Sequence, residues 1–293
     1  MDVSIVIRTY NESRHLPALL AGIDEQSLDG RRIEVVVVDS GSTDATVPIA
    51  RERGCHIVEI AKSEFTFGRS LNVGCEAAAG SYLVFASGHC VPASNRWIVN
   101  LVRPLEEGSA AYTYGRQIGN GSSRFSERQH FRKYFPEQSR IPQDDIFCNN
   151  ANAAVPRAIW QKFRFDESLT GLEDMEFASR LIRDRCNIGY VADAPVYHLH
   201  EESWHKVRIR YEREAMALQQ ILPQVHVSFL DFLRYLLSAL MLDFGQALQE
   251  RVLLRHASEI LLFRLMQFWG AYRGNHEHRR LSREMKERYF YPK

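Results

Sequence analysis

Four short apolar runs alternate with helix-like segments over the first 86 residues, and this alternation is the strongest constraint on the fold. The runs, at residues 3–7, 33–38, 56–60 and 82–86, are rich in valine and isoleucine and have the length of buried strands. The segments between them carry apolar residues at helical spacing, for example Leu16, Leu19, Leu20 and Ile23. This order predicts an α/β fold with a mainly parallel, Rossmann-like sheet and flanking helices.

Short polar residues mark the expected starts of these helices. We expect Asn11 or Ser13 to cap the first helix and the run Ser42-Thr43-Asp44 to cap the second, because such side chains accept hydrogen bonds from free backbone N–H groups. The third helix is expected to run from about Ser70 to Gly80.

Polar residues also follow the ends of the expected strands. Residues 8–12 read Arg-Thr-Tyr-Asn-Glu, residues 39–42 read Asp-Ser-Gly-Ser, and residues 87–89 read Ser-Gly-His. Ligands of parallel sheets bind beyond the carboxyl ends of the strands, so we expect these residues to converge on one crevice. Neither GxGxxG nor GxxxxGK[ST] follows the first strand, which argues against a dehydrogenase or a P-loop kinase.

Two interpretations stay open at the first two strand ends. The hydroxyl, amide and aromatic groups of residues 9–12 suit a nucleotide base and ribose, yet Asn11 or Ser13 can equally be a simple helix cap. Asp39 ends a run of four valines, and its carboxylate suits a base N–H or a ribose hydroxyl. An aspartate in this position can also serve only to form the turn.

The last third of the chain has a different pattern. Residues 206–285 are helical in periodicity, whereas residues 110–150 mix polar and aromatic residues in a way typical of a long loop. Charges at Asp231, Arg234 and Asp243 interrupt the apolar stretch 229–244 and argue against a transmembrane span. From His205 onward there are 15 Lys and Arg against 9 Asp and Glu, too few to indicate nucleic-acid binding. Attachment to an anionic membrane surface, a homodimer interface, and packing onto the rest of the chain all remain open.

The cysteines and the first residues of the sequence indicate in which cellular compartment we expect the protein. Five cysteines are scattered without a CxxC pair, which favours free thiols over disulfides. The first residues lack the basic and apolar regions of a signal peptide. We therefore expect a cytoplasmic protein, with peripheral attachment to the inner face of the cell membrane as an alternative.

Several motifs together resemble glycosyltransferase family 2, whose members are inverting enzymes with the GT-A fold. The motifs are SIVIRTYNE at residues 4–12, VVVDSGSTD at 36–44, RSLNVG at 69–74, NAA at 152–154, Trp160, and GLEDMEF at 171–177. The resemblance covers about residues 3–204, and the layout further resembles the rhamnosyltransferase-like branch of bacterial surface polysaccharide synthesis. We expect a GT-A catalytic domain over residues 1–205 and a C-terminal helical extension over residues 206–293.

The resemblance also implies the site residues. It implies Asp174 as the catalytic base and Glu173 as its companion, because inversion needs a base on the acceptor hydroxyl opposite the departing diphosphate. The implied nucleotide-binding residues are Thr9, Tyr10, Asn11, Glu12, Asp39, Ser40, Arg69 and Asn72, and the residues implied near the diphosphate or a metal ion are Ser87, His89, His198 and His200. Both acids also suit an ordinary helix N-terminus, where the helix dipole would lower the pKa of Asp174.

One motif departs from the family. Where most members carry an Asp-x-Asp motif that binds Mg²⁺ or Mn²⁺, this chain reads Ser87-Gly88-His89. Mg²⁺ prefers oxygen ligands, so the loss of both carboxylates argues against it. Either His89 and a second imidazole bind a softer ion such as Mn²⁺, or imidazoles and arginines neutralise the diphosphate without metal. We expect no metal requirement, or a weak dependence on Mn²⁺ or Mg²⁺.

The predicted function is transfer of a hexose or deoxyhexose from a nucleotide diphosphate sugar to a hydroxyl of a glycan or lipid-linked acceptor in polysaccharide synthesis. One alternative is a catalytically inactive sugar-nucleotide-binding module, which the missing Asp-x-Asp motif favours and the Glu173-Asp174 pair opposes. A nucleotidyltransferase is the other, but it would need a glycine-rich loop with a basic residue where this chain reads Thr-Tyr-Asn-Glu.

Overall fold

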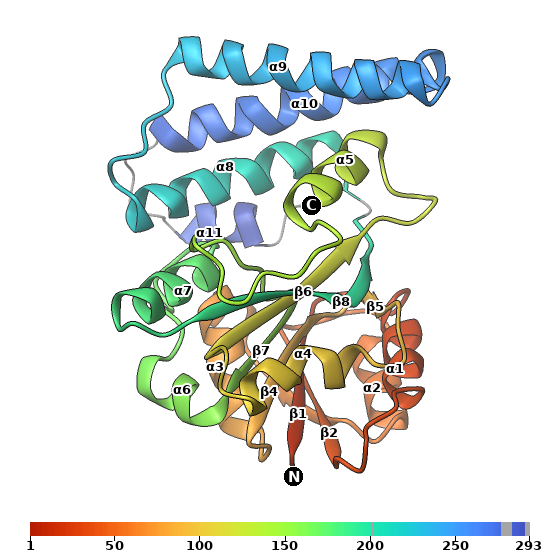
Figure 1. Ribbon diagram of the computed structural model, residues 1–293, viewed down its shortest axis with the longest axis vertical. Coiled ribbons are helices and arrows are strands. Elements are labelled where there is room, and N and C mark those ends of the chain that lie inside the picture. Colours follow the sequence, from red (N-terminus) through yellow and green to blue (C-terminus); the bar gives the residue numbers. More distant parts are fainter. Residues whose placement is uncertain (201, 277–282, 291–293) are drawn as a thin grey trace. The chain divides into compact units, whose positions relative to one another are not determined.

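The computed structural model describes residues 1–200, 202–276 and 283–290 of the 293-residue chain (Figure 1). The chain forms two compact units. The first comprises Met1–Asn120, Tyr134–Leu169 and Glu173–Leu199, and the second comprises Gly121–Lys133, Thr170–Leu172 and His200–Lys293. The expected division between residues 205 and 206 stays a prediction.

The first unit is built on an eight-stranded mixed sheet with the order β3-β2-β1-β4-β7-β6-β8-β5. Its strands are β1 (Val3–Thr9), β2 (Ile33–Asp39), β3 (His56–Glu59), β4 (Tyr82–Ser87), β5 (Cys90–Pro92), β6 (Tyr112–Ile118), β7 (Asn152–Pro156) and β8 (Ile188–His198). The first four strands pair in parallel, as the sequence predicts, and β7 pairs antiparallel with β4. The expected α/β fold is confirmed.

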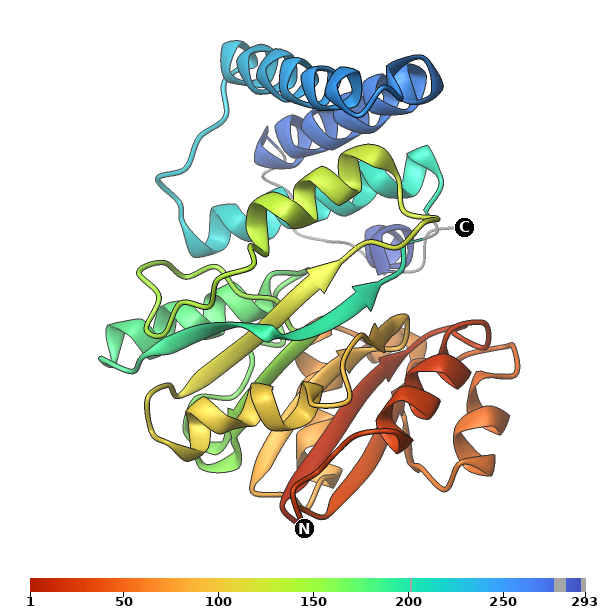
Figure 2. The same cartoon turned by 45° about the vertical axis from the view of Figure 1, so that its right-hand side comes forward.

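Helices cover both faces of this sheet (Figures 1 and 2). They are α1 (Leu16–Asp24), α2 (Thr46–Glu52), α3 (Phe67–Ala77), α4 (Trp97–Glu106), α6 (Arg157–Phe163) and α7 (Glu173–Arg183), with a 3-10 turn η1 at Lys62–Glu64. Ile5 and Ile7 of β1 share one buried core with Leu16 of α1 and Trp97 of α4. Helix α3 packs against β1 and β2.

The helix caps differ from the prediction in part. No side chain caps α1, which begins after His15, so the expectation of a cap by Asn11 or Ser13 is wrong. Asn11 adopts a left-handed φ of 56° and its Oδ1 accepts from the Thr43 N–H at 2.8 Å, so it joins two loops instead. Asp44 accepts from the N–H of Thr46 at 3.0 Å, at the start of α2.

The region expected to be a long loop contains regular structure. Residues 112–118 form β6, and residues 125–134 form α5 (Phe125–Tyr134), so the loop expectation for residues 110–150 is wrong there. The polar residues at the end of β6 did not indicate a buried strand in the sequence. Gln117 is nevertheless 1 % exposed, because its side chain forms a hydrogen bond with His198 inside the unit.

The second unit is helical. Besides most of α5 it contains α8 (Trp204–Ile221), α9 (Phe229–Gln249), α10 (Leu253–His276) and α11 (Arg283–Phe290). The predicted helical pattern is confirmed for the described residues, while residues 277–282 of the predicted range lie outside them. Glycines let α10 approach α8 closely, since a Cβ atom at Gly274 would lie 2.0 Å from the Glu212 carbonyl oxygen. Among the described helices, none has the length and apolar character needed to cross a membrane.

Candidate active site

The ends of β1 and β2 form the first part of the site, with Thr9 opposite Asp39. The Asp39 carboxylate is 2 % exposed and accepts from the Thr9 hydroxyl at 3.0 Å and from the Ser42 hydroxyl at 2.5 Å. It also accepts from the backbone N–H groups of Gly41 at 3.0 Å and Ser42 at 2.8 Å. The Ser40 hydroxyl donates to the Thr9 carbonyl at 3.1 Å. Asp39 therefore shapes this loop, and its contact with a nucleotide stays a prediction.

The loop after β1 is tied to its neighbours. The Asn11 N–H donates to the Ser42 hydroxyl at 2.8 Å, so the two loops form one hydrogen-bonded platform. The Lys62 ammonium lies 3.1 Å from the Tyr10 hydroxyl and 5.2 Å from the centre of its ring. Lys62 places a cation beside the predicted base-binding and ribose-binding residues.

Helix α3 carries two of the predicted nucleotide-binding residues, Arg69 and Asn72. Arg69 lies in its first turn, and its guanidinium is 3.4 Å from Glu167 and 3.7 Å from Glu64. Asn72 is 1 % exposed, and its amide bonds to the backbone of Phe165 in both directions, to Glu167, and to the Trp160 indole. Asn72 thus anchors the segment after α6, and the predicted nucleotide contacts of both residues stay predictions.

Two histidines from distant parts of the chain meet beside the end of β1. His89 lies between β4 and β5, and β5 pairs antiparallel with β8 so that Cys90 lies opposite His198. The two Nε2 atoms are 3.1 Å apart, with the rings stacked at 5.0 Å between centres. The sequence-based grouping of His89 with His198 is present in the fold. Ser87 lies opposite Arg8 in the β1–β4 pairing and is half-buried.

The outer nitrogen of each imidazole faces an oxygen. His89 Nδ1 lies 2.7 Å from Glu12 Oε1, and His198 Nδ1 lies 2.6 Å from Gln117 Oε1. Carboxylate and amide oxygens only accept, so each Nδ1 donates a hydrogen. With neutral rings, both Nε2 atoms then carry a lone pair, which is the donor that a metal ion uses. Oxygen partners on the outer nitrogens are typical of metal-ligating histidines.

His200 belongs to the second unit, and its contacts lie within that unit. Its Nδ1 lies 2.6 Å from Glu127 of α5, and its ring stacks on Phe131 with 6.3 Å between centres. Its predicted position near the diphosphate or a metal ion stays a prediction.

The two acids at the start of α7 form the remaining part of the site. Glu173 is 3 % exposed and Asp174 is 7 % exposed. The guanidinium of Arg8, at the end of β1, donates to Glu173 at 2.9 Å. The Asn150 N–H donates to Asp174 Oδ2 at 3.0 Å, and the Met175 N–H donates to Oδ1 at 2.8 Å. The carboxylate of Asp174 is therefore held in one orientation.

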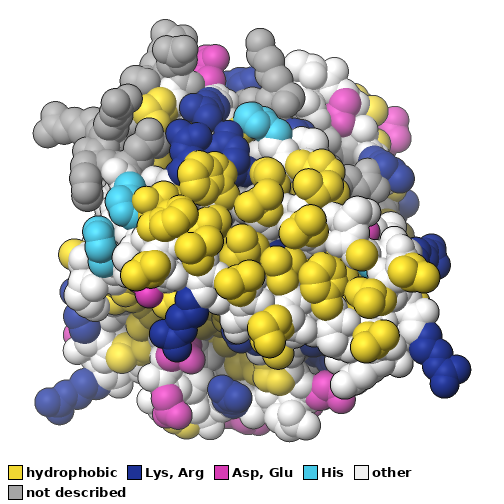
Figure 3. All heavy atoms as spheres, turned by 90° about the horizontal axis from the view of Figure 1, so that it is seen from above, with side chains coloured by type: hydrophobic (Ala, Val, Ile, Leu, Met, Phe, Trp, Pro, Cys, Tyr) yellow, Lys and Arg dark blue, Asp and Glu magenta, His cyan; other side chains and the backbone are white. Residues whose placement is uncertain are grey.

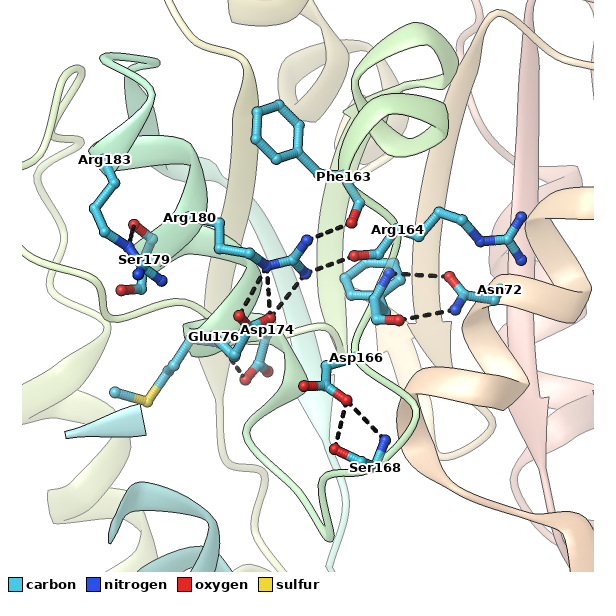
Figure 4. Close-up of polar contacts among 12 residues, drawn as sticks. Asn72, Phe163, Arg164, Asp166, Ser168, Asp174, Glu176, Ser179, Arg180 and Arg183 are labelled. Carbon is cyan, nitrogen blue, oxygen red and sulfur yellow. Dashed lines mark hydrogen bonds and ion pairs between the residues drawn. The ribbon is translucent and has the colours of Figure 1, made fainter. Parts of the chain in front are cut away.

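A half-buried arginine, Arg180, fixes the helix that carries these acids. Arg180 of α7 bonds to Glu176 one turn before it and to the backbone carbonyls of Phe163 and Arg164 at the end of α6 (Figure 4). Because α6 follows directly on β7, these bonds tie α7 to the sheet. The position of Asp174 is thus set by tertiary contacts as well as by its own helix.

Burial changes the acidity of the predicted base. It raises the pKa of Asp174 from the ordinary value of 3.8 to about 7, and the Glu173 carboxylate adds to the rise. The N–H groups of Asn150 and Met175 and the charge of Arg8 act in the opposite direction without offsetting it. The expectation of a lowered pKa from the helix dipole is wrong, because desolvation outweighs the dipole at a buried carboxyl.

Comparison with known proteins identifies the family. The model of the family described as Glycosyl transferase family 2 matches residues 4–164, more than half of the chain. The chain belongs to glycosyl transferase family 2.

The glycosyltransferase also has named relatives. It is 26% identical over 213 residues to the O-antigen chain rhamnosyltransferase RfbN of Salmonella typhimurium, covering 68% of this chain and 67% of the relative. It is 26% identical over 178 residues to the O-antigen chain rhamnosyltransferase WbaN of Salmonella anatum, covering 57% of this chain and 56% of the relative. The chain thus spans about two thirds of one relative and just over half of the other. The expected resemblance to the rhamnosyltransferase-like branch is confirmed.

Solved structures resemble the glycosyltransferase in fold. The mannosyltransferase PcManGT from Pyrobaculum calidifontis, in complex with GDP-Man and Mn²⁺, matches with a TM-score of 0.62 at 18% identity, covering 92% of this chain and 84% of that chain. TarS 1–349 of S. aureus in complex with UDP-GlcNAc matches with a TM-score of 0.55 at 18% identity, covering 95% and 93%. The expected GT-A fold is confirmed.

Four residues of the glycosyltransferase site carry roles that the sequence did not assign to them. Arg8 pairs with Glu173, Asn150 holds Asp174, Gln117 orients His198, and Lys62 lies on Tyr10. The sequence could have indicated Arg8, because it lies at the end of a predicted strand among the motif residues. Asn150 and Lys62 lie in segments without periodicity, and Gln117 lies in a strand that its polar residues made unpredictable. The roles of these three residues follow only from contacts with residues far away in the sequence.

Proposed function

We propose that this glycosyltransferase moves a hexose or deoxyhexose from a nucleoside diphosphate sugar to a hydroxyl of a glycan or lipid-linked acceptor in bacterial polysaccharide synthesis, with inversion. The observation that carries the proposal is the buried Asp174 carboxyl, held by two backbone N–H groups and with its pKa raised to about 7. A general base works best when its pKa lies near the working pH. The O-antigen chain rhamnosyltransferases among the relatives support the class of product, and the GDP-Man complex supports the class of donor.

In the proposed reaction, the Asp174 carboxylate takes the proton of the acceptor hydroxyl. The acceptor oxygen forms a bond to the anomeric carbon while the bond from that carbon to the diphosphate oxygen breaks. The nucleoside diphosphate leaves with the bonding electron pair, and attack from the opposite side inverts the configuration. Glu173, which pairs with Arg8, raises the pKa of Asp174 and so its basicity.

The platform formed by the loops after β1 and β2 is the proposed binding place of the nucleoside. Asp39 and Asn11 hold its shape, and Tyr10 and Lys62 offer a ring and a cation at its side. Arg69 and Asn72, in the first half of α3, are the proposed neighbours of the diphosphate.

Between His89 and His198 we propose a site for a divalent metal ion, one of the two alternatives that the sequence left open. The donor set fits, because both Nε2 atoms converge at 3.1 Å and both outer nitrogens are bonded to oxygens. Imidazole ligands favour an ion softer than Mg²⁺, such as Mn²⁺. When bound, such an ion would offset the negative charge of the leaving diphosphate. Glu12 then acts by orienting His89.

A transfer assay with a matched variant tests the function. Purified protein is incubated with a panel of nucleoside diphosphate sugars and glycan acceptors, and Asp174→Asn should lower transfer by about 10²-fold or more without changing donor affinity. The control Asp184→Asn alters an exposed acid at the other end of α7 and should transfer like the wild type. Wild-type turnover in Asp174→Asn would reject the base assignment. Donor binding by the wild type without transfer or hydrolysis, with Mn²⁺ present, would instead identify an inactive binding module.

A further inference from the structure

Helices α9 and α10 present a large exposed apolar surface, which we call the α9–α10 face (Figure 3). Leu254 is 99 % exposed, Leu230 is 76 % exposed and Met241 is 74 % exposed. The face is defined by Leu230, Leu237, Met241 and Leu248 of α9 and Leu254 and Leu261 of α10. Contiguous exposed apolar patches on this scale mark interaction sites in soluble proteins.

The apolar character of this face does not serve the core of the second unit. Helix α9 already buries Phe232, Leu236 and Ala247 on its inner side, and Ala247 packs with Ile260 of α10. An amphipathic helix of a globular protein keeps polar residues on its outer side. Helix α9 carries leucine and methionine there instead, which indicates that its outer side contacts an apolar partner.

Three arginines lie on the helices of the face and in the turn between them. Arg234, Arg251 and Arg255 are exposed, and none of them forms a salt bridge with any residue that the structure describes. Basic side chains lie at the border of the apolar field in Figure 3.

The acids of this region have partners of their own, including Glu259 of α10, which accepts from the Phe125 N–H. Asp231 forms a capping box with Ser228, and Asp243 is buried against Arg264 at 2.8 Å. Glu250 forms a salt bridge with Arg132 at 3.0 Å. The net charge that the face offers to a partner is therefore positive.

We propose that the α9–α10 face docks on an anionic lipid surface, with its leucines in the acyl boundary and its arginines on lipid headgroups. A second copy fits less well, because a symmetric contact would bring the same unpaired arginines together. An apolar face bordered by arginines is the pattern of helices that lie in the plane of a membrane interface. The exposed aromatic rings of Tyr235 and Trp269 suit the headgroup region. This proposal is independent of the transfer reaction.

Vesicle flotation of the full-length protein tests the docking. The vesicles contain phosphatidylcholine alone or phosphatidylcholine mixed with phosphatidylglycerol, and we expect binding only to the anionic mixture. One variant, Leu237→Glu with Met241→Glu, places charge on the exposed face and should abolish binding. A second, Arg234→Glu with Arg255→Glu, should weaken binding by at least about 25-fold, since each surface arginine contributes about fivefold.

A charge-matched control separates docking from overall charge. Arg32→Glu with Arg53→Glu reverses two exposed arginines of the first unit and should bind vesicles like the wild type. Equal binding to neutral and anionic vesicles, or unchanged binding by both face variants, would overturn the proposal. So would a lipid-free dimer in sedimentation analysis that Leu237→Glu with Met241→Glu turns into a monomer, because a second copy would then occupy the face.

Discussion

Arg8 and Glu173 are 165 residues apart in the chain, yet the guanidinium of Arg8 lies 2.9 Å from the carboxylate of Glu173. The ion pair joins the end of β1 to the first turn of α7, next to Asp174. Glu173 raises the pKa of Asp174 and Arg8 lowers it, so the two residues of one ion pair act on the proposed base in opposite directions. The end of β1 and the residue beside the proposed base are thus joined by this ion pair.

This coupling predicts opposite shifts in the pH profile of transfer. Asp174 must be deprotonated to act, so kcat/KM should rise as pH increases through about 7 in the wild type. Glu173→Gln removes the negative neighbour and should move this rise to lower pH. Arg8→Gln should move it to higher pH, because the carboxyl pair then takes up its protons more readily. Arg8→Lys keeps the charge and serves as the control; shifts of the same sign in both Gln variants would contradict the arrangement.

The same pKa predicts how stability depends on pH. Between the ordinary value of 3.8 and about 7, the folded protein holds a proton on Asp174 that the unfolded chain has released. The free energy of unfolding should therefore fall as pH rises through this range. Asp174→Asn is neutral at every pH, so denaturant unfolding at several pH values should show a smaller fall for the variant. Parallel curves for the two proteins would mean that Asp174 is ionised in the folded state throughout.

The paired histidines predict a metal-binding defect that does not depend on turnover. Mn²⁺ titration followed by electron paramagnetic resonance should show tight binding by the wild type and its loss in His89→Ala. Glu12→Gln, which changes only the partner of His89 Nδ1, should lower the affinity by about 10- to 100-fold. His56→Ala removes an exposed imidazole on β3 and is the control. Equal Mn²⁺ affinity in all four proteins, with transfer unaffected by EDTA, would mean that the two imidazoles share a proton.

Much of the sheet was predictable because its strands are buried on both faces. Runs such as 33–38 consist almost entirely of valine and isoleucine, and this composition alone indicates a central parallel strand. Strand β6 was not predictable, because Arg116 and Gln117 break its apolar run while the fold still buries Gln117. The prediction of a cap on α1 is wrong for a related reason. Asn11 accepts a hydrogen bond from Thr43 in another loop, and a rule based on neighbouring residues does not consider such a partner.

The sequence named candidate site residues, whereas their interactions come only from the structure. The structure brings His89 and His198 together, because β5 begins directly after His89 and pairs with the end of β8, where His198 lies. Their hydrogen-bond partners Glu12 and Gln117 lie far away in the sequence and are seen only in the folded structure. The pKa of Asp174 is raised, whereas the sequence predicted that it would be lowered. The helix dipole can be inferred from the position of Asp174 in its helix, but its burial depends on the whole fold.

The role of Asp39 gives the last prediction. Asp39→Ala removes the acceptor of four hydrogen bonds, one from Thr9 at the end of β1 and three from the loop after β2, and should weaken binding of a nucleoside diphosphate by about 1–3 kcal/mol in calorimetry. Ser42→Ala disturbs the same loop but leaves the Asp39 carboxylate in place. If Asp39 contacts the nucleoside directly, Asp39→Ala should weaken binding much more than Ser42→Ala, and pyrophosphate affinity should not change. Equal losses in the two variants would mean that Asp39 acts through the shape of the loop, and unchanged affinity in both would remove this loop from the nucleotide site.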